Sequence, residues 1–189
     1  VRDPHLDSVV DIDQTPDGAA FLICERRPAR ALSALRDSPL SVDAALAVIA
    51  QLVAGLRALH QHGVTHRSVQ PHSVRISSDL DPPLSQLVDL GIAQVSPNGH
   101  PELTELTSAA AQAAIHADEI LTESPQEAER LRRYRAPELA AGLHAATPAA
   151  DLYSLGILAL DLLSQEEPSG TGEALSPESA QRRLSKVRA

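Results

Sequence analysis

Four histidines lie close together in the chain and could ligate a metal ion; they are His60, His62, His66 and His72. Neutral imidazoles are common zinc ligands, usually in combination with cysteine or carboxylate ligands. Here no cysteine lies near the histidines, because the only cysteine in the sequence is Cys24. His60 also stands at the end of a predicted helix. The lack of a nearby cysteine and the position of His60 in a helix therefore argue against a zinc site at these histidines.

The residues after these histidines offer other chemistry. Asp89 carries a carboxylate, which could bind magnesium or could simply accept hydrogen bonds from the local backbone, and both interpretations stay open. Ser68 carries a hydroxyl that is far too weakly basic to accept a proton from a substrate. The segment therefore combines one candidate metal ligand with a hydroxyl that cannot act as a general base.

Short strands and apolar helices must position these residues. Val9 to Ile12 and Ala19 to Cys24 flank the turn sequence Thr15 to Gly18 and predict a β-hairpin. Pro28 to Asp37 favours a short helix. Val74 to Ser77 and Gln86 to Asp89 are typical of two further short strands.

Two longer helices are predicted. Ser41 is a suitable N-cap for the first helix, and Gly63 a suitable stop. The first helix carries one predicted apolar stripe, formed by Leu46, Ile49, Leu52, Val53, Leu56 and Leu59. Thr147 caps a second helix that runs through Leu163 and is apolar on nearly every face, which predicts a position at the centre of the domain. Ser176 begins a last, polar helix.

Helical pieces are also expected within residues 109–121 and 126–133. This order of elements is not a βαβ repeat. It predicts a helical domain with a small β element.

Composition limits the classes of function. The chain has 189 residues, 43% of them hydrophobic, which fits one folded domain. A net charge of −9 argues against a broad nucleic-acid or membrane surface. We expect no membrane-spanning run and no signal peptide, and therefore a cytoplasmic location. Because the chain starts at Val1 and contains no methionine, we expect it to be a piece of a longer protein.

The segment from His60 to Val74 resembles the catalytic loop of protein kinases, whose pattern is H-R-D-L-K-P-x-N after a long helix. Other segments resemble the family's last small-lobe strands, metal motif, Ala-Pro-Glu motif and central helix; they are Pro4–Leu6, Leu22–Glu25, Val88–Ala93, Tyr134–Glu138 and Ala150–Gly156. Motifs in this order are hard to obtain by accident. The chain is thus identified as a member of the protein kinase superfamily, similar to bacterial Ser/Thr-kinase-like domains.

This resemblance implies an α+β, protein-kinase-like fold, mainly the helical C-lobe. Residues 1–27 would be the last strands of the small lobe and the hinge, and residues 28–189 the C-lobe. Residues 89–138 would form an unusually long activation segment. The glycine-rich loop and the strand lysine of the family are not in these residues and could lie upstream.

The catalytic loop departs from the family at three positions. Ser68 stands where the family has the aspartate that accepts the hydroxyl proton. Gln70 replaces the lysine that meets the transferred phosphate, and Ser73 replaces the asparagine that holds a second magnesium ion. Losing a base, a cation and a metal ligand together should leave little phosphoryl transfer.

The nucleotide cleft is altered as well. The resemblance implies ATP and magnesium as cofactors, with Asp89 as the retained metal ligand. Cys24 would border the back of the nucleotide pocket, and Glu25 would follow it where the strand runs into the hinge. Arg75, however, stands where the family places an apolar residue beneath the adenine ring. Its charge argues against ordinary ATP binding, so no cofactor is assigned from the sequence.

Retained residues imply a preserved scaffold. His66 and Leu90 match the family's internal apolar stack, with Val9 as a third candidate. Asp151 resembles the buried aspartate that accepts N–H bonds from the catalytic loop. Arg67 would clamp an activation-segment phosphate in an active relative. Glu138 corresponds to the family's glutamate that pairs with an arginine of the C-terminal helices, a part that we expect to be missing from these residues, so no partner is assigned to it.

Three functional hypotheses follow. The leading one is a pseudokinase module that regulates or binds a protein partner, or the rest of its own polypeptide, with no nucleic-acid or membrane contact. The second is an active Ser/Thr protein kinase with atypical catalytic residues. The third is a degenerate remnant without function.

Overall fold

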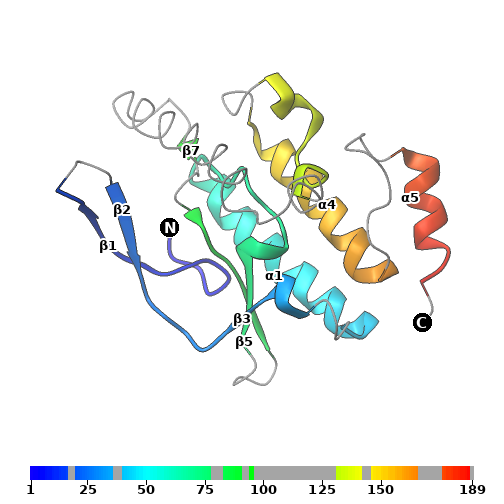
Figure 1. Ribbon diagram of the computed structural model, residues 1–189, viewed down its shortest axis with the longest axis horizontal. Coiled ribbons are helices and arrows are strands. Elements are labelled where there is room, and N and C mark those ends of the chain that lie inside the picture. Colours follow the sequence, from blue (N-terminus) through cyan, green and yellow to red (C-terminus); the bar gives the residue numbers. More distant parts are fainter. Residues whose placement is uncertain are drawn as a thin grey trace.

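The computed structural model describes residues 1–16, 20–35, 40–77, 83–90, 94–95, 131–141, 146–165 and 176–187. Two helices, α1 (Val42–Gln61) and α4 (Pro148–Ser164), pack against each other at its centre, as Figure 1 shows. The helix expected within 109–121 and most of the one within 126–133 lie outside the described residues, as does most of the segment 89–138. Mixed helices and strands agree with the predicted α+β fold.

The predicted hairpin is present. Strand β1 (Val9–Gln14) pairs antiparallel with β2 (Ala20–Cys24), and the pair lies to one side of the helices (Figure 1). Val9 is 41% exposed, so the prediction that it joins a buried stack with His66 and Leu90 is wrong. The exposure follows from the position of the strand, which stands away from the core that contains His66.

A three-stranded sheet has the order β3-β5-β6, with β3 at Arg30–Ala31, β5 at Val74–Ser77 and β6 at Leu84–Leu87. The last strand begins and ends two residues earlier than predicted. Asp89 has φ 66°, a left-handed conformation that cannot continue a strand. The short helix expected within residues 28–37 is a single 3₁₀ turn, η1 (Leu32–Leu35), directly after β3.

The N-terminal segment lies along the edge of this sheet. Leu6 forms a parallel bridge with Leu87, the Asp7 amide donates to the Leu87 carbonyl at 2.8 Å, and the Leu87 amide donates to the His5 carbonyl at 2.9 Å. Leu6 is 2% exposed. Backbone bonds and one buried leucine thus join the hairpin to the helical part.

Helix α1 begins at its predicted cap, because the Ser41 side chain accepts a hydrogen bond from the Ala44 amide. Its buried face consists of Ala45, Val48, Leu52, Gly55, Leu56 and Leu59. Two members of the predicted stripe, Leu46 and Val53, instead lie on the exposed side at 50% and 45% exposure. The sequence prediction was wrong there because α1 is apolar on two faces, so periodicity alone merged them.

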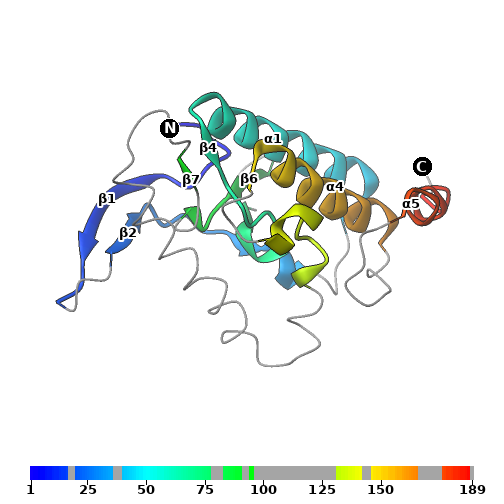
Figure 2. The ribbon, with the colours of Figure 1, turned by 90° about the horizontal axis from the view of Figure 1, so that it is seen from above.

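Helix α4 lies beside α1 and carries much of the core, including Leu155 and Leu158 at 5% and 1% exposure. The helix is not buried on every face, since Leu152 is 54% exposed. Helix α5 (Pro177–Leu184) packs against α4, and its N-cap is Ser176 as predicted (Figure 2).

By length and composition alone, α1 is apolar enough to cross a membrane, which the sequence analysis did not anticipate. Its inner face, however, packs in the core of the domain. Core helices of water-soluble domains pass the same test, so this feature by itself assigns no membrane span.

We predict that Gly55→Ala destabilises the domain. A methyl group at Gly55 would lie 2.9 Å from the His5 carbonyl oxygen and 3.3 Å from a Leu6 methyl carbon, so the N-terminal segment would have to shift. We expect a loss of about 1–3 kcal/mol in the free energy of unfolding, measured by urea titration.

The matched control is Gly156→Ala in α4, where, apart from the adjacent residues and the backbone of α4 itself, no atom of the described residues lies within 4 Å of the added carbon. Alanine is the better helix former, so stability should rise by up to about 1 kcal/mol. Equal effects of the two substitutions would show that the contact at Gly55 is not a close one.

Candidate functional site

The candidate site is the loop between α1 and β5. It contains the short strand β4 (Val64–Thr65), which pairs antiparallel with β7 (Gln94–Val95), and the 3₁₀ turn η2 (Pro71–Ser73). Val69 is 1% exposed and anchors the middle of the loop in the core. Apolar burial therefore fixes the loop at its centre, while hydrogen bonds fix its two ends.

Asp151 holds the start of this loop. One carboxylate oxygen accepts the His66 amide at 2.8 Å and lies 2.8 Å from His60 Nε2, and the other accepts the Arg67 amide at 2.8 Å. Asp151 is 1% exposed and sits in the first turn of α4. A carboxylate buried this deeply costs free energy unless hydrogen bonds replace its hydration, and these three contacts supply them. The role that the resemblance implied for Asp151 is present in the structure.

His66 is fully buried and connects the loop to the strand that ends before Asp89. Its Nε2 lies 2.9 Å from the Val88 carbonyl oxygen, which can only accept, so Nε2 carries the proton. Its Nδ1 accepts the Ser68 amide at 3.3 Å. Burial lowers the pKa of His66, although the charge of Asp151 acts in the opposite direction. His66 is therefore a neutral structural residue and not a proton donor to a substrate.

Arg67 occupies a strained backbone position. Its φ is 73°, which costs a residue with a side chain free energy, and its side chain is buried. Burial lowers the pKa of the guanidinium, and the charge of Asp151 raises it. Guanidinium groups nevertheless remain charged in proteins. The bond from the Arg67 amide to Asp151 helps to hold this conformation.

The three altered positions of the loop bond to one another. The Gln70 side-chain amide donates to Ser68 Oγ at 3.1 Å, and the Gln70 backbone amide donates to Ser73 Oγ at 3.0 Å. Ser73 Oγ lies 2.6 Å from the Ser68 carbonyl oxygen and 3.0 Å from that of Gln70, so these two acceptors share its one proton. Ser73 has no exposed surface. Ser73 is therefore turned inward, while Ser68 and Gln70 are half-buried and bond to each other within the loop.

Asp89 follows the loop in space, because the Val88 amide donates to the Ser73 carbonyl. Partial burial of the carboxyl raises the pKa of Asp89, although the residue as a whole is exposed; the charge of Arg75 lowers this pKa and the charge of Asp7 raises it. Arg75 itself is solvent-exposed. The expected charge at Arg75 is thus close enough to act on the one candidate metal ligand.

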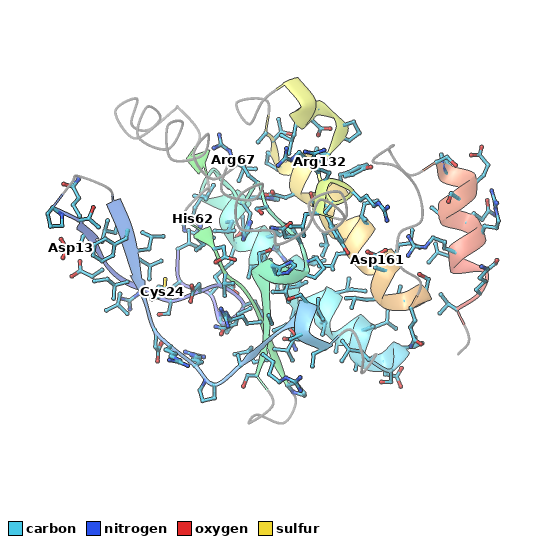
Figure 3. The ribbon with its side chains drawn as sticks, viewed as in Figure 1. Asp13, Cys24, His62, Arg67, Arg132 and Asp161 are labelled. Carbon is cyan, nitrogen blue, oxygen red and sulfur yellow. The ribbon has the colours of Figure 1, made fainter. Side chains whose placement is uncertain are left out.

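Cys24 ends β2 and faces the rest of the domain (Figure 3). Burial, a hydrogen bond with Asp7 and the charges of Asp7 and Asp89 raise the pKa of the Cys24 thiol to about 11. The thiol is therefore protonated at neutral pH and a poor nucleophile. Glu25 is exposed, and its carboxylate pairs with Arg27 at 3.4 Å.

These residues do not fit a magnesium-nucleotide centre. In the described part of the chain, no group of three or more histidine, cysteine or carboxylate side chains is gathered in a way that could hold a metal ion. The Ser73 hydroxyl is bonded inside the loop, and Asp89 has an arginine charge nearby. The histidines considered as zinc ligands have separate partners, since His60 meets Asp151 and His62 Nδ1 lies 2.8 Å from the Ala58 carbonyl oxygen.

A second polar cluster connects α5 to the Ala-Pro-Glu segment. Asp161 on α4 accepts the Tyr134 hydroxyl and the Arg183 guanidinium, the latter at 2.7 Å (Figure 3). Arg183 also donates to Ser164 at 3.0 Å. Loss of hydration raises the pKa of Asp161, and the bonds from Tyr134 and Arg183 lower it. Buried ion pairs of this kind fix geometry more than they add stability.

Sequence reasoning missed this cluster. No partner was predicted for Glu138 within this chain, and the structure shows it exposed and without an ion pair among the described residues. The C-terminal arginine Arg183 pairs with Asp161. The available signal was Asp161 itself, the one charged residue after the first turn of an otherwise apolar helix.

Comparison with known proteins agrees with the resemblance. The family described as protein kinase domain matches residues 9–187 of the chain. The serine/threonine-protein kinase Pkn1 of Myxococcus xanthus is 30% identical over 165 residues, which cover 87% of this chain and 21% of that protein. The kinase pkn2 of the same organism is 29% identical, with 89% and 18% covered.

A further relative is the serine/threonine-protein kinase PknE of Mycobacterium tuberculosis, which is 28% identical over 170 residues. The match covers 89% of this chain and 25% of that kinase. The chain therefore spans about a quarter or less of the length of these three relatives.

We predict that Asp151→Asn strongly destabilises the domain. Asparagine turns one accepting oxygen into a donating amide, which would face a backbone N–H and leave it without a partner. We expect a loss of about 3 kcal/mol or more in the free energy of unfolding by urea titration. Asp43→Asn, on the exposed first turn of α1, is the matched control and should cost less than about 1 kcal/mol. Similar losses at both positions would contradict the role of Asp151.

We also predict a pH dependence that comes from His66. Because its pKa is lowered in the folded state, the unfolded chain binds a proton below pH 6.5 that the folded chain refuses. The free energy of unfolding should therefore fall as the pH drops below this value, by at most about 1.4 kcal/mol per pH unit from this residue.

The test compares the wild type with His66→Gln by urea titration between about pH 7 and pH 5.5. The slope should be smaller in the variant, because the titrating ring is gone while the other histidines are unchanged. Parallel slopes would mean that His66 has the same pKa in the folded and the unfolded chain.

Proposed function

The chain belongs to the protein kinase family, and we propose that this domain has lost phosphoryl transfer and works as a regulatory, protein-binding module. Its partner in this proposal is another protein or the remainder of its own polypeptide. The net charge of −9 favours neither nucleic acid nor an anionic membrane as the partner. A cytoplasmic location is part of the same proposal.

The hydrogen bonds among the three altered loop positions carry this proposal. Phosphoryl transfer in this family depends on a proton acceptor, a cation at the transferred phosphate and metal ligands, all facing the cleft. Ser68, Gln70 and Ser73 offer none of these groups and bond to each other. General-base catalysis alone contributes about 10²–10⁴-fold to such reactions, so the loss should be large.

The surroundings of Asp89 support the absence of ordinary nucleotide binding. Asp89 is exposed, and the positive charge of Arg75 acts on its carboxylate, which is the one candidate metal ligand. A cation already near a carboxylate reduces what a metal ion gains from it. ATP and magnesium are therefore not assigned as cofactors in this proposal.

The retained scaffold supports a binding role over a remnant without function. Arg67 and Asp89 keep left-handed backbone conformations that cost free energy. Asp151 keeps its full set of hydrogen bonds to the loop. A chain under no constraint would gain stability by relaxing these positions.

An active Ser/Thr kinase is the second candidate. It is favoured by the similarity to three proteins that are named serine/threonine-protein kinases and by the carboxylate at Asp89. In that case the missing base would have to come from a residue outside the described part of the chain.

The test is a single-turnover transfer of labelled γ-phosphate from ATP with magnesium, in the full natural protein. We expect no transfer above that of the Asp89→Asn variant, either to the protein itself or to casein, because the loop holds no base. Transfer by the wild type that disappears in Asp89→Asn would contradict the proposal.

Two controls make a negative result informative. The triple variant Ser68→Asp, Gln70→Lys, Ser73→Asn returns the family residues to the loop and tests whether the defect is confined there. The midpoint of thermal unfolding, with and without ATP and magnesium, reports nucleotide binding separately from transfer. We expect no shift in the wild type.

A further inference from the structure

Helix α1 is apolar on two faces, and only one of them is buried. Leu52 and Leu56 lie in the core, whereas Leu46 and Val53 remain 50% and 45% exposed. Only 33% of the most apolar stretch of the helix is buried. In Figure 2, α1 lies along the upper edge of the molecule with α4 beneath it. A surface helix normally carries polar residues on its outer face, so this apolar face indicates a contact surface.

The exposed face forms one continuous band, which we call the outer stripe. Its members recur at the three- and four-residue spacing of a single helix face. The outer stripe consists of Asp43, Leu46, Ala47, Ala50, Val53, Ala54 and Arg57. Six of these residues are exposed, and Ala54 is half-buried.

The outer stripe has an internal order. Asp43, Ala50 and Arg57 lie seven residues apart along its middle, because seven residues make almost two full turns. Leu46 and Val53 lie along one edge at the same spacing. Ala47 and Ala54 lie along the other edge, where small side chains would let a second helix come close.

The two ends of the outer stripe carry opposite charges at equal distances from Ala50. Asp43 lies seven residues before it and Arg57 seven residues after it, each about 10 Å along the helix. Within the described part of the chain, neither Asp43 nor Arg57 forms an ion pair. A surface with this arrangement is complementary to itself when it is turned end over end.

We propose that the outer stripe is a homodimer interface, in which α1 packs antiparallel against α1 of a second copy around a two-fold axis beside Ala50. In this arrangement Leu46 contacts Val53 of the second copy, and Ala47 contacts Ala54 of the second copy. Asp43 meets Arg57 of the second copy at both ends. The contact is isologous, as most soluble dimer interfaces are.

The charges favour a second copy over a membrane surface. An anionic bilayer attracts basic residues but gains nothing from Asp43, which begins the outer stripe. In an antiparallel pair, Asp43 of each copy lies opposite Arg57 of the other copy, so both charges of both copies are paired. This interface does not rest on the loss of phosphoryl transfer, so it can fail or hold independently of the proposed function.

A single pair of helices buries a small interface, so we expect the dimer to be weak. Contacts of this size fall in the range of weak or transient complexes, with dissociation constants of roughly 10–500 μM. The domain should therefore be mainly monomeric at low concentration and increasingly dimeric as its concentration rises.

The main test is sedimentation equilibrium of the full chain over a concentration series, with charge reversals in the outer stripe. Asp43→Arg places two arginines against each other at each end, and Arg57→Asp places two aspartates there. Each should weaken dimerisation at least about tenfold. The double variant restores opposite charges and should return the dissociation constant to within about threefold of the wild type.

A second test fixes the orientation, in a Cys24→Ser background that removes the natural thiol. Ala50→Cys lies beside the two-fold axis, so the two copies should form a disulfide under mild oxidation. Gln61→Cys, at the exposed end of the same helix, is the matched control. Its two thiols would lie about 33 Å apart along an antiparallel pair and should not cross-link.

Several results would overturn the interface. One is a monomer at every concentration up to about 500 μM. Another is a dimer that the single charge reversals leave unchanged, because that dimer would use a different surface. A third is binding to phosphatidylcholine–phosphatidylserine vesicles without self-association, which would assign the outer stripe to a membrane surface. Far-UV circular dichroism confirms that each exposed variant remains folded.

Discussion

The Asp151 carboxylate is the contact on which the catalytic-loop segment depends. It is buried at the start of α4 and accepts the amides of His66 and Arg67, while His60 approaches it from the end of α1. The end of α1 and the loop that follows it therefore meet the distant start of α4 at one charge. A buried charge without such partners would cost several kcal/mol, so the helices and the loop depend on one another. Through His66, the same network reaches the backbone before Asp89.

This arrangement separates the shape of the loop from its chemistry. The backbone is held by Asp151, His66 and apolar burial, and none of these contacts needs a base, a phosphate or a metal ion. The positions that would supply chemistry can then change without loss of the fold, provided that their polar groups find new partners. Ser68 and Ser73 do so within the loop itself. The contacts that hold the shape of this loop therefore do not depend on catalytic groups, and a preformed surface suits the binding role that we propose.

The sequence predicted the order of the elements and the identity of the loop, because caps, turns and family motifs are local signals. It did not predict which face of α1 is buried, since Leu46 and Leu52 are equally apolar and only tertiary packing distinguishes them. It also missed the bond between Asp161 and Arg183, because a charge in an apolar helix signals that Asp161 needs a partner but not which residue that partner is. The bonds that Ser73 makes were equally hidden, since a serine near a turn has many local acceptors.

Hydrogen exchange of the His66 and Arg67 amides, measured by NMR in the nucleotide-free protein, tests the central claim most directly. If Asp151 holds the loop without help from any ligand, both amides should exchange only through global unfolding. Their protection should then equal the free energy of unfolding measured by urea titration. Exchange through local opening, several kcal/mol below that value, would contradict the claim and would mean that the loop is ordered only when something is bound.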